Sequence, residues 1–198
     1  MIIVFLTKKL CYGRGRNRMT ELKTIDELIL KKISVYYTSL ENMHLLETVH
    51  SYIENNKDKF TEKSWNCNIK TSKTISQNIL YDIEEFNHLA TSLENIIKEL
   101  LYKNFKKYTP FMIFESWINI LGEHGYQEPH LHGDCGSAVL YLTENNSEIE
   151  FIIYPEDLRK AIVPKKGAVL LFDGTTYHRV VESKHERMSL AFNFNLLK

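Results

Sequence analysis

The feature that most constrains the fold is a succession of short β-type segments that begins after Pro110. Each segment is rich in β-branched and aromatic residues, and turn-forming residues such as Asn145-Asn146 and Asp173-Gly174 separate the segments. No helical periodicity intervenes, so this half of the chain is predicted to form a β-sandwich or a double-sheet jelly roll. The predicted strands span residues 111–121, 137–142, 148–154, 168–172 and 188–196.

The first half of the chain predicts a short strand and two amphipathic helices. Apolar and polar residues alternate over residues 31–37, which indicates a strand. The first helix is expected to begin after Ser39, which offers an N-terminal cap, because apolar residues then recur at helical spacing. The second helix carries an apolar stripe over residues 83–101, and Asp82 is expected to start a capping box before it.

The length of 198 residues is the size of one domain. Because the two helices need a sheet to bury their apolar stripes, residues 19–198 are predicted to form a single α+β domain. Within it, residues 39–103 would provide helical support and residues 111–198 the jelly-roll core. Residues 1–18 include a run rich in Gly and Arg and are expected to form a flexible extension.

Composition excludes several classes of protein. Lys and Arg number 25, as do Asp and Glu, so no global basic surface for nucleic acid is expected. No run approaches the roughly 20 apolar residues of a membrane span. The three cysteines show no CxxC spacing, which argues against a disulfide scaffold and favours a reducing, cytoplasmic compartment.

Residues 128–134 concentrate side chains that bind metal ions. His132 and Asp134 are two residues apart, so on an extended chain they point to the same face. His178 follows a predicted strand and turn, and it is the candidate for a third ligand. Two histidines and one carboxylate form the ligand set of non-haem Fe(II) oxygenases, which leaves positions open for a co-substrate and dioxygen.

A candidate anion pocket follows His178 in the last predicted strand. Arg187 and Ser189 share one face of that strand, and a guanidinium with a hydroxyl forms charge-assisted hydrogen bonds to a carboxylate. 2-Oxoglutarate chelates iron through its keto acid and directs a second carboxylate away. The pair is therefore expected to bind that distal carboxylate, and Tyr141 and Asn119 are further candidates for contacts with 2-oxoglutarate.

Short motifs in a fairly specific order extend from about Trp65 to the C-terminus. They are Trp65-x-Cys67, Thr71-Ser72, Ser116-Trp117-Ile118-Asn119, Pro129-His130-Leu131-His132, Ser137-Ala138-Val139-Leu140-Tyr141-Leu142, Pro164 with Gly167, Leu171-Phe172, His178 and Glu186-Arg187-Met188-Ser189. In these motifs the chain resembles the 2-oxoglutarate/Fe(II) oxygenases of phages and marine bacteria, which are relatives of the prolyl hydroxylases. The resemblance implies a cupin-like double-stranded β-helix (a jelly roll). It also implies dependence on Fe(II) and 2-oxoglutarate, with oxidation of a substrate coupled to formation of succinate and carbon dioxide.

The resemblance also raises a second ligand set. The strong feature of the family is His-x-His, here His130 and His132, so the set His130, His132 and His178 competes with the set His132, Asp134 and His178. On an extended chain the side chains of His130, His132 and Asp134 could all share one face, so strand alternation does not separate the two sets. The chemistry favours the set with the carboxylate, because that set is the documented one for this chemistry.

These features predict a dioxygenase that uses Fe(II), 2-oxoglutarate and dioxygen, with ascorbate as a reductant, to hydroxylate a C–H bond. The prime substrate is expected to be a protein or peptide side chain or a small, amino-acid-like molecule, by analogy with prolyl hydroxylases. Two alternatives remain. One is a cupin-like dioxygenase with three histidine ligands and no 2-oxoglutarate, and the other is a non-enzymatic jelly-roll binding module.

Overall fold

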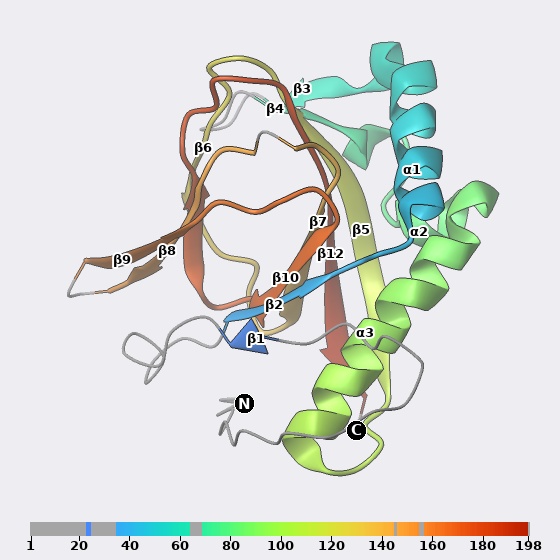
Figure 1. Ribbon diagram of the computed structural model, residues 1–198, viewed down its shortest axis with the longest axis vertical. Helices are drawn as coiled ribbons and strands as arrows, with labels where there is room; N and C mark the ends of the chain where they lie inside the picture. The colour runs from blue at the N-terminus through green and yellow to red at the C-terminus, as the bar shows by residue number, and fades with distance from the viewer. Residues whose placement is uncertain (1–22, 25–34, 64–68, 145, 155–156, 198) are drawn as a thin grey trace.

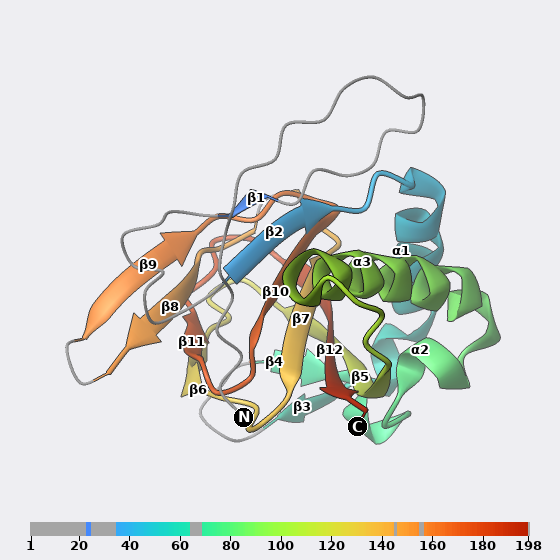
Figure 2. The same ribbon diagram turned by 90° about the horizontal axis from the view of Figure 1, so that it is seen from below.

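The computed structural model describes residues 23–24, 35–63, 69–144, 146–154 and 157–197. Two antiparallel sheets form its core (Figures 1 and 2). The larger sheet has the strand order β1 (Lys23–Thr24), β2 (Val35–Ser39), β10 (Ala168–Asp173), β7 (Gly136–Tyr141), β12 (Arg187–Leu196), β5 (Phe111–Leu121), β4 (Ile69–Thr71) and β3 (Thr61–Lys63). The smaller sheet has the order β6 (Gln127–His130), β11 (Tyr177–Val180), β8 (Ile149–Ile153) and β9 (Leu158–Ile162).

Helices cover one face of the larger sheet, on the side away from the smaller sheet (Figures 1 and 2). They are α1 (Met43–Asn56), the single turn α2 (Ile79–Asp82) and α3 (Asn87–Phe105), with short 3-10 turns at Lys57–Lys59, Ser72–Thr74 and Glu84–Phe86. The apolar stripe of α3 is buried against the sheet as predicted, and each Leu or Ile buried in this way contributes about 1.5–3 kcal/mol. Its buried residues are Leu89, Ala90, Leu93, Ile97, Leu100 and Leu101.

Both helix caps differ from the sequence prediction. Ser39 ends β2, and Asn42 caps α1 instead, because its side chain accepts a hydrogen bond from the backbone N–H of Leu45. Asp82 does not start the long helix. It ends α2, where its carboxylate accepts a hydrogen bond from Ser76, and α3 begins only at Asn87, without a side-chain cap.

The strands predicted in the second half are present, and β5 has the predicted bounds. Strands β6, β9 and β11 were not predicted, since they are short and have neither regular alternation nor a continuous apolar run. The larger sheet also recruits the N-terminal half of the chain through β1 to β4. In particular, β2 pairs with β10 from Val35 opposite Phe172 to Ser39 opposite Ala168.

Several predictions lie outside the described residues. These are the flexible extension over residues 1–18, the first part of the strand predicted over residues 31–37, and the motif of Trp65 and Cys67. Among the described helices, none combines the length and the apolar character that a membrane crossing needs.

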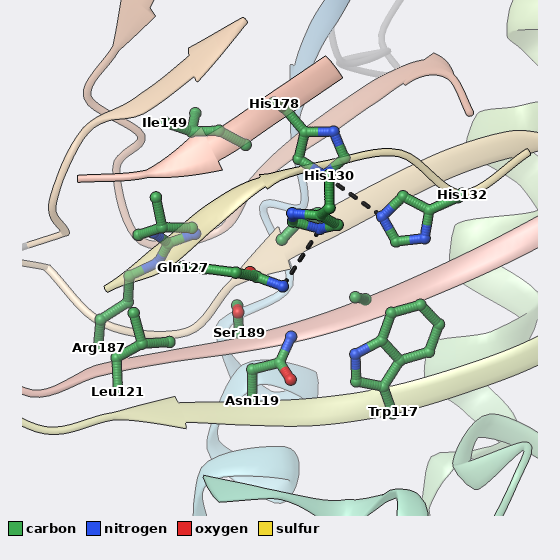
Figure 3. A pocket seen from close by; sticks show the side chains of 13 residues that line it. Trp117, Asn119, Leu121, Gln127, His130, His132, Ile149, His178, Arg187 and Ser189 are labelled. Atoms are coloured by element: carbon green, nitrogen blue, oxygen red, sulfur yellow. Dashed lines mark hydrogen bonds between the residues drawn. The ribbon is translucent and has the colours of Figure 1, made fainter. Parts of the chain in front are cut away.

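The central strands bring residues that are distant in the sequence into one row. β12 pairs with β5 on one side and with β7 on the other. Ser189 therefore lies directly opposite Asn119 on β5 and opposite Tyr141 on β7. Strand β11 of the smaller sheet pairs with β6, which places His178 opposite His130. Asn119 and Ser189 of the larger sheet and His130 and His178 of the smaller sheet line one pocket between the sheets (Figure 3).

Candidate metal centre and anion pocket

Three histidines meet between the two sheets. His130 ends β6, His178 lies on the neighbouring strand β11, and His132 lies two residues beyond the end of β6. Each offers a ring nitrogen, and these three atoms all lie within 4.8 Å of one another. Imidazole nitrogens at this spacing can bind one transition-metal ion such as Fe(II).

Backbone carbonyls orient two of the three rings. His178 Nδ1 lies 2.9 Å from the carbonyl oxygen of Thr176, and His130 Nδ1 lies 2.9 Å from that of Glu128. Since a carbonyl only accepts, both Nδ1 atoms carry the proton, and both Nε2 atoms keep a lone pair. This arrangement is the one that metal-bound histidines adopt in proteins.

The environment keeps His178 neutral. Its side chain is buried, and burial is the largest cause that lowers its pKa well below the ordinary value, followed by the positive charges that His130 and His132 would carry. Neutral imidazole is the form that binds metal. The indole of Trp117 stacks on the ring of His132 at a centroid distance of 5.8 Å and limits the orientations of that ring.

Asp134 is exposed and is not among the residues that the structure brings to this cluster. The reason is the backbone between His132 and Asp134. Gly133 has a φ of +90°, in the left-handed region, so the chain turns there instead of continuing as a strand. The turn is closed by a hydrogen bond from the Cys135 N–H to the Gly133 carbonyl. The strand geometry that would place Asp134 beside His132 therefore ends before Asp134.

Arg187 and Ser189 lie in the same pocket as the three histidines, as Figure 3 shows. Both are 2% exposed. The residues that line the pocket include no Asp or Glu, so the Arg187 guanidinium has no carboxylate partner there. Its Nε has no hydrogen-bond partner among the described residues, and its Nη1 reaches only the hydroxyl of Ser147, at 3.3 Å. A buried cation in this state can bind an anionic ligand.

Asn119 lines the pocket, and Tyr141 lies behind it beside Arg187. The ring of Tyr141 lies 4.9 Å from the Arg187 guanidinium carbon, and the Tyr141 hydroxyl has no partner among the described residues. Burial raises the pKa of Tyr141 to about 12, so the hydroxyl stays protonated and available to donate. Asn119 lines the pocket next to Ser189. The polar groups predicted for 2-oxoglutarate are thus adjacent.

A wider groove of about 540 Å³ adjoins the histidines. Its walls come from β4, β5 and β6, and they include Trp117, His130 and His132. Lys73 and Glu115 form an ion pair in the wall at 3.6 Å, and the Lys73 ammonium lies 3.8 Å from the centre of the Trp117 ring. The groove opens directly onto His130 and His132.

Four residues around the histidines were not predicted from the sequence: Glu115, Trp117, Gln127 and Asn193. Gln127 lies 3.2 Å from His130 Nε2 through its amide nitrogen. A signal for Glu115 and Trp117 was present, since both are two-residue steps from Asn119 on one strand and therefore share its face. No comparable signal marks Gln127, because it belongs to a strand that was not predicted.

Two facing antiparallel sheets with histidines between them define a double-stranded β-helix protein with a candidate metal centre. No protein-family model matches the sequence, and no curated protein matches it. Solved structures match the fold. A Pseudomonas putida prolyl-4-hydroxylase has a TM-score of 0.66 at 14% identity, over 85% of this chain and 96% of its own.

Two further solved structures with this fold are of proteins other than prolyl hydroxylases. The non-haem α-ketoglutarate-dependent epimerase SnoN of nogalamycin biosynthesis has a TM-score of 0.62 at 11% identity, over 81% of this chain and 77% of its own. HygX from Streptomyces hygroscopicus was solved with nickel, 2-oxoglutarate and hygromycin B bound. It has a TM-score of 0.62 at 11% identity, over 84% of each chain. The chain therefore has the fold predicted from its sequence resemblance.

Proposed function

We propose that this protein is an Fe(II)- and 2-oxoglutarate-dependent dioxygenase. The observation that carries the proposal is that one pocket holds both a three-imidazole cluster and a buried arginine without an acidic partner in the pocket lining. A metal ion and a dicarboxylate satisfy these two features together. The fold shared with oxygenases of this kind supports the same conclusion.

The residues present fit Fe(II). His130, His132 and His178 would hold it, since imidazole nitrogen is a suitable donor and two of the rings already keep Nε2 unprotonated. We therefore favour the three-histidine set over the set that contains the exposed Asp134. Bound Fe(II) would supply the reaction with dioxygen that converts 2-oxoglutarate to succinate and carbon dioxide and hydroxylates a C–H bond.

Arg187 and Ser189 would bind the distal carboxylate of 2-oxoglutarate, and Asn119 and Tyr141 would donate further hydrogen bonds. Because Arg187 is buried, its attraction for a carboxylate is weakly screened by water. The apolar pocket residues Leu121, Ile149 and Val180 exclude water from the reacting groups. These residues hold the co-substrate in one orientation toward the three imidazoles.

We propose that the prime substrate enters through the groove beside Trp117 and is a protein or peptide side chain or a small, amino-acid-like molecule. A groove of about 540 Å³ is within the usual size of small-molecule sites. Hydroxylation is the reaction proposed, although solved structures with this fold include an epimerase as well as a prolyl hydroxylase. We place the reaction in the cytoplasm, in line with the cysteine pattern of the sequence. Ascorbate is proposed as the reductant.

A second candidate is a cupin-like dioxygenase that uses three histidines without 2-oxoglutarate. The exposed position of Asp134 favours it, since that leaves three imidazoles and no carboxylate at the cluster. It gives the buried Arg187 no ligand, and for this reason we prefer the first candidate. A non-enzymatic binding module would leave both the cluster and Arg187 without a role.

The test is turnover of 2-oxoglutarate by the purified full chain with Fe(II), ascorbate and air. We expect slow release of succinate without a prime substrate, and loss of release in the variant Arg187→Met. Oxidation of a substrate that continues unchanged in Arg187→Met would identify the second candidate. Failure of the chain to bind either Mn(II) or 2-oxoglutarate would leave only the binding module.

A further inference from the structure

The hydrogen bonds around His132 determine which of its ring nitrogens carries the proton. His178 Nδ1 donates to the Thr176 carbonyl, so His178 Nε2 is an acceptor. His132 Nε2 lies 3.3 Å from that Nε2 and is therefore the donor in this pair. A neutral imidazole carries one proton, so His132 Nδ1 is an acceptor.

Asn193 supplies the matching donor. Its amide nitrogen lies 3.2 Å from His132 Nδ1 and 2.5 Å from a carboxylate oxygen of Glu115. The Ser137 hydroxyl donates to the other end of the same amide, at 2.7 Å. Asn193 is 1% exposed, and all three of these contacts come from side chains. Asn193 thus links Glu115, Ser137 and His132 in one hydrogen-bond network in which each donor faces an acceptor.

Metal binding requires the opposite proton position. When His132 Nε2 binds a metal ion, its proton has to be on Nδ1, and Nδ1 then needs an acceptor. An asparagine amide offers both kinds of group, because its oxygen accepts and its nitrogen donates. A half-turn of the Asn193 amide presents its oxygen to His132 and its nitrogen to Ser137. The carboxylate of Glu115 then keeps its ion pair with Lys73.

We infer that Asn193 is the positioning residue for His132, and that its amide orientation decides whether His132 Nε2 is free to bind metal. This inference rests on the proposed metal site. Glu115 holds the amide in the metal-free orientation, so it opposes metal binding. A carboxylate at position 193 with a neutral amide at position 115 would reverse this preference, because the carboxylate can only accept from His132.

Two variants separate this role from a purely structural one. Asn193→Leu keeps the approximate side-chain volume and removes both hydrogen-bonding ends. The double variant Asn193→Asp with Glu115→Gln keeps the charge and the number of polar groups but places the acceptor beside His132. Asn195→Leu is the matched control, since Asn195 is on the same strand and does not line the pocket.

The first measurement is Mn(II) affinity of the full chain, from the electron paramagnetic resonance signal of free Mn(II). We expect Asn193→Leu to bind Mn(II) about 10- to 100-fold more weakly than the double variant, because it leaves His132 Nδ1 without the acceptor that metal binding requires. The double variant should bind Mn(II) at least as tightly as the unmodified chain. The control Asn195→Leu should have the affinity of the unmodified chain. Equal affinity in Asn193→Leu and the double variant, or an affinity of the double variant below that of the unmodified chain, would overturn the inference.

The second measurement needs no metal and covers the case in which Asn193→Leu does not fold. Two-bond proton–nitrogen spectra of the metal-free chain report the tautomer of each histidine. We expect the proton of His132 on Nε2 in the unmodified chain and on Nδ1 in the double variant. The same tautomer in both would overturn the inference while leaving the metal site intact. If the unmodified chain does not bind Mn(II) at all, the proposed function fails together with the inference.

Discussion

His130 and His178 are direct cross-strand neighbours in the smaller sheet, and their ring centroids lie 4.3 Å apart. The pairing of β6 with β11 thus brings two of the three candidate metal ligands together. His132 then approaches from the turn that follows β6, where its backbone N–H donates to the Gly174 carbonyl. The positions of these backbones decide which residues can bind metal.

The first prediction separates the two possible ligand sets. We expect His130→Ala to weaken Mn(II) binding by at least about 10-fold, because it removes one of three donors, whereas Asp134→Ala should leave the affinity within about 2-fold. Mn(II) affinity of the two variants, measured side by side, checks this. His185→Ala serves as an exposed control. Loss of Mn(II) in Asp134→Ala would restore the set of His132, Asp134 and His178.

The second prediction concerns Arg187. Hydrogen bonds to charged groups are worth about 1.5–3 kcal/mol, so Arg187→Met should weaken 2-oxoglutarate binding by about 10- to 100-fold. The Mn(II) affinity should not fall, because Arg187 is not part of the histidine cluster and its positive charge does not attract a metal ion. Titration calorimetry measures 2-oxoglutarate binding to the Mn(II)-loaded chain, and Mn(II) binding to the chain before it is loaded. Arg159→Met, on an exposed part of β9, is the matched control and should bind 2-oxoglutarate normally.

The same substitution should stabilise the protein when 2-oxoglutarate is absent. A buried cation without a partner costs folding free energy, and burial accordingly lowers the pKa of Arg187. We expect the melting temperature of ligand-free Arg187→Met to lie above that of the unmodified chain, and this order to reverse with saturating Mn(II) and 2-oxoglutarate. A lower melting temperature in both conditions would mean that Arg187 is a structural residue.

The fourth prediction concerns removal of the metal. Ligands that bind only the folded state add stability, about 2.7 kcal/mol at a concentration 100 times the Kd. Mn(II) should therefore raise the melting temperature, and 2-oxoglutarate should raise it further only when Mn(II) is present. Excess chelator should return it to the metal-free value. A shift with 2-oxoglutarate alone, of equal size, would show that the carboxylate site works without the metal.

The fifth prediction tests the packing of α3 on the sheet. Leu93 is fully buried in the largest apolar cluster, so Leu93→Ala should lower the free energy of unfolding by about 2–5 kcal/mol. Leu158→Ala makes the same chemical change at a site that is 53% exposed, and it should cost less than about 0.5 kcal/mol. Denaturant titrations of the two variants check this difference.

The fold class was predictable because long apolar strands carry their own signal. β5 and the stripe of α3 have a strong periodicity that tertiary contacts reinforce. The short strand β11 carries little signal of its own. It is a strand because β6 and β8 both pair with it, and no local pattern reports such pairing. The capping box expected at Asp82 failed because Ser76 competes for the same carboxylate.

The candidate site was predictable in its residue types and less so in its geometry. His178, Arg187 and Ser189 lie in one pocket, as their order in the sequence suggested. The position of Asp134 depended on whether the chain stays extended past His132, and a glycine at position 133 allows either outcome. Asn193 was missed because an asparagine in the last strand has no distinguishing pattern. Its role follows only from the side chains that two other strands, β5 and β7, and the turn after β6 bring to it.

The pairing of β2 with β10 has a consequence for synthesis of the chain on the ribosome. Val35 and Phe172 are partners in the sheet, although most of the sequence separates them. The N-terminal strand therefore leaves the ribosome long before its partner, and during that interval its backbone hydrogen-bonding groups and its apolar side chains Val35 and Tyr36 lack their final contacts. Closing so long a loop is slow, so nascent chains of this protein are expected to depend on chaperones until β10 emerges.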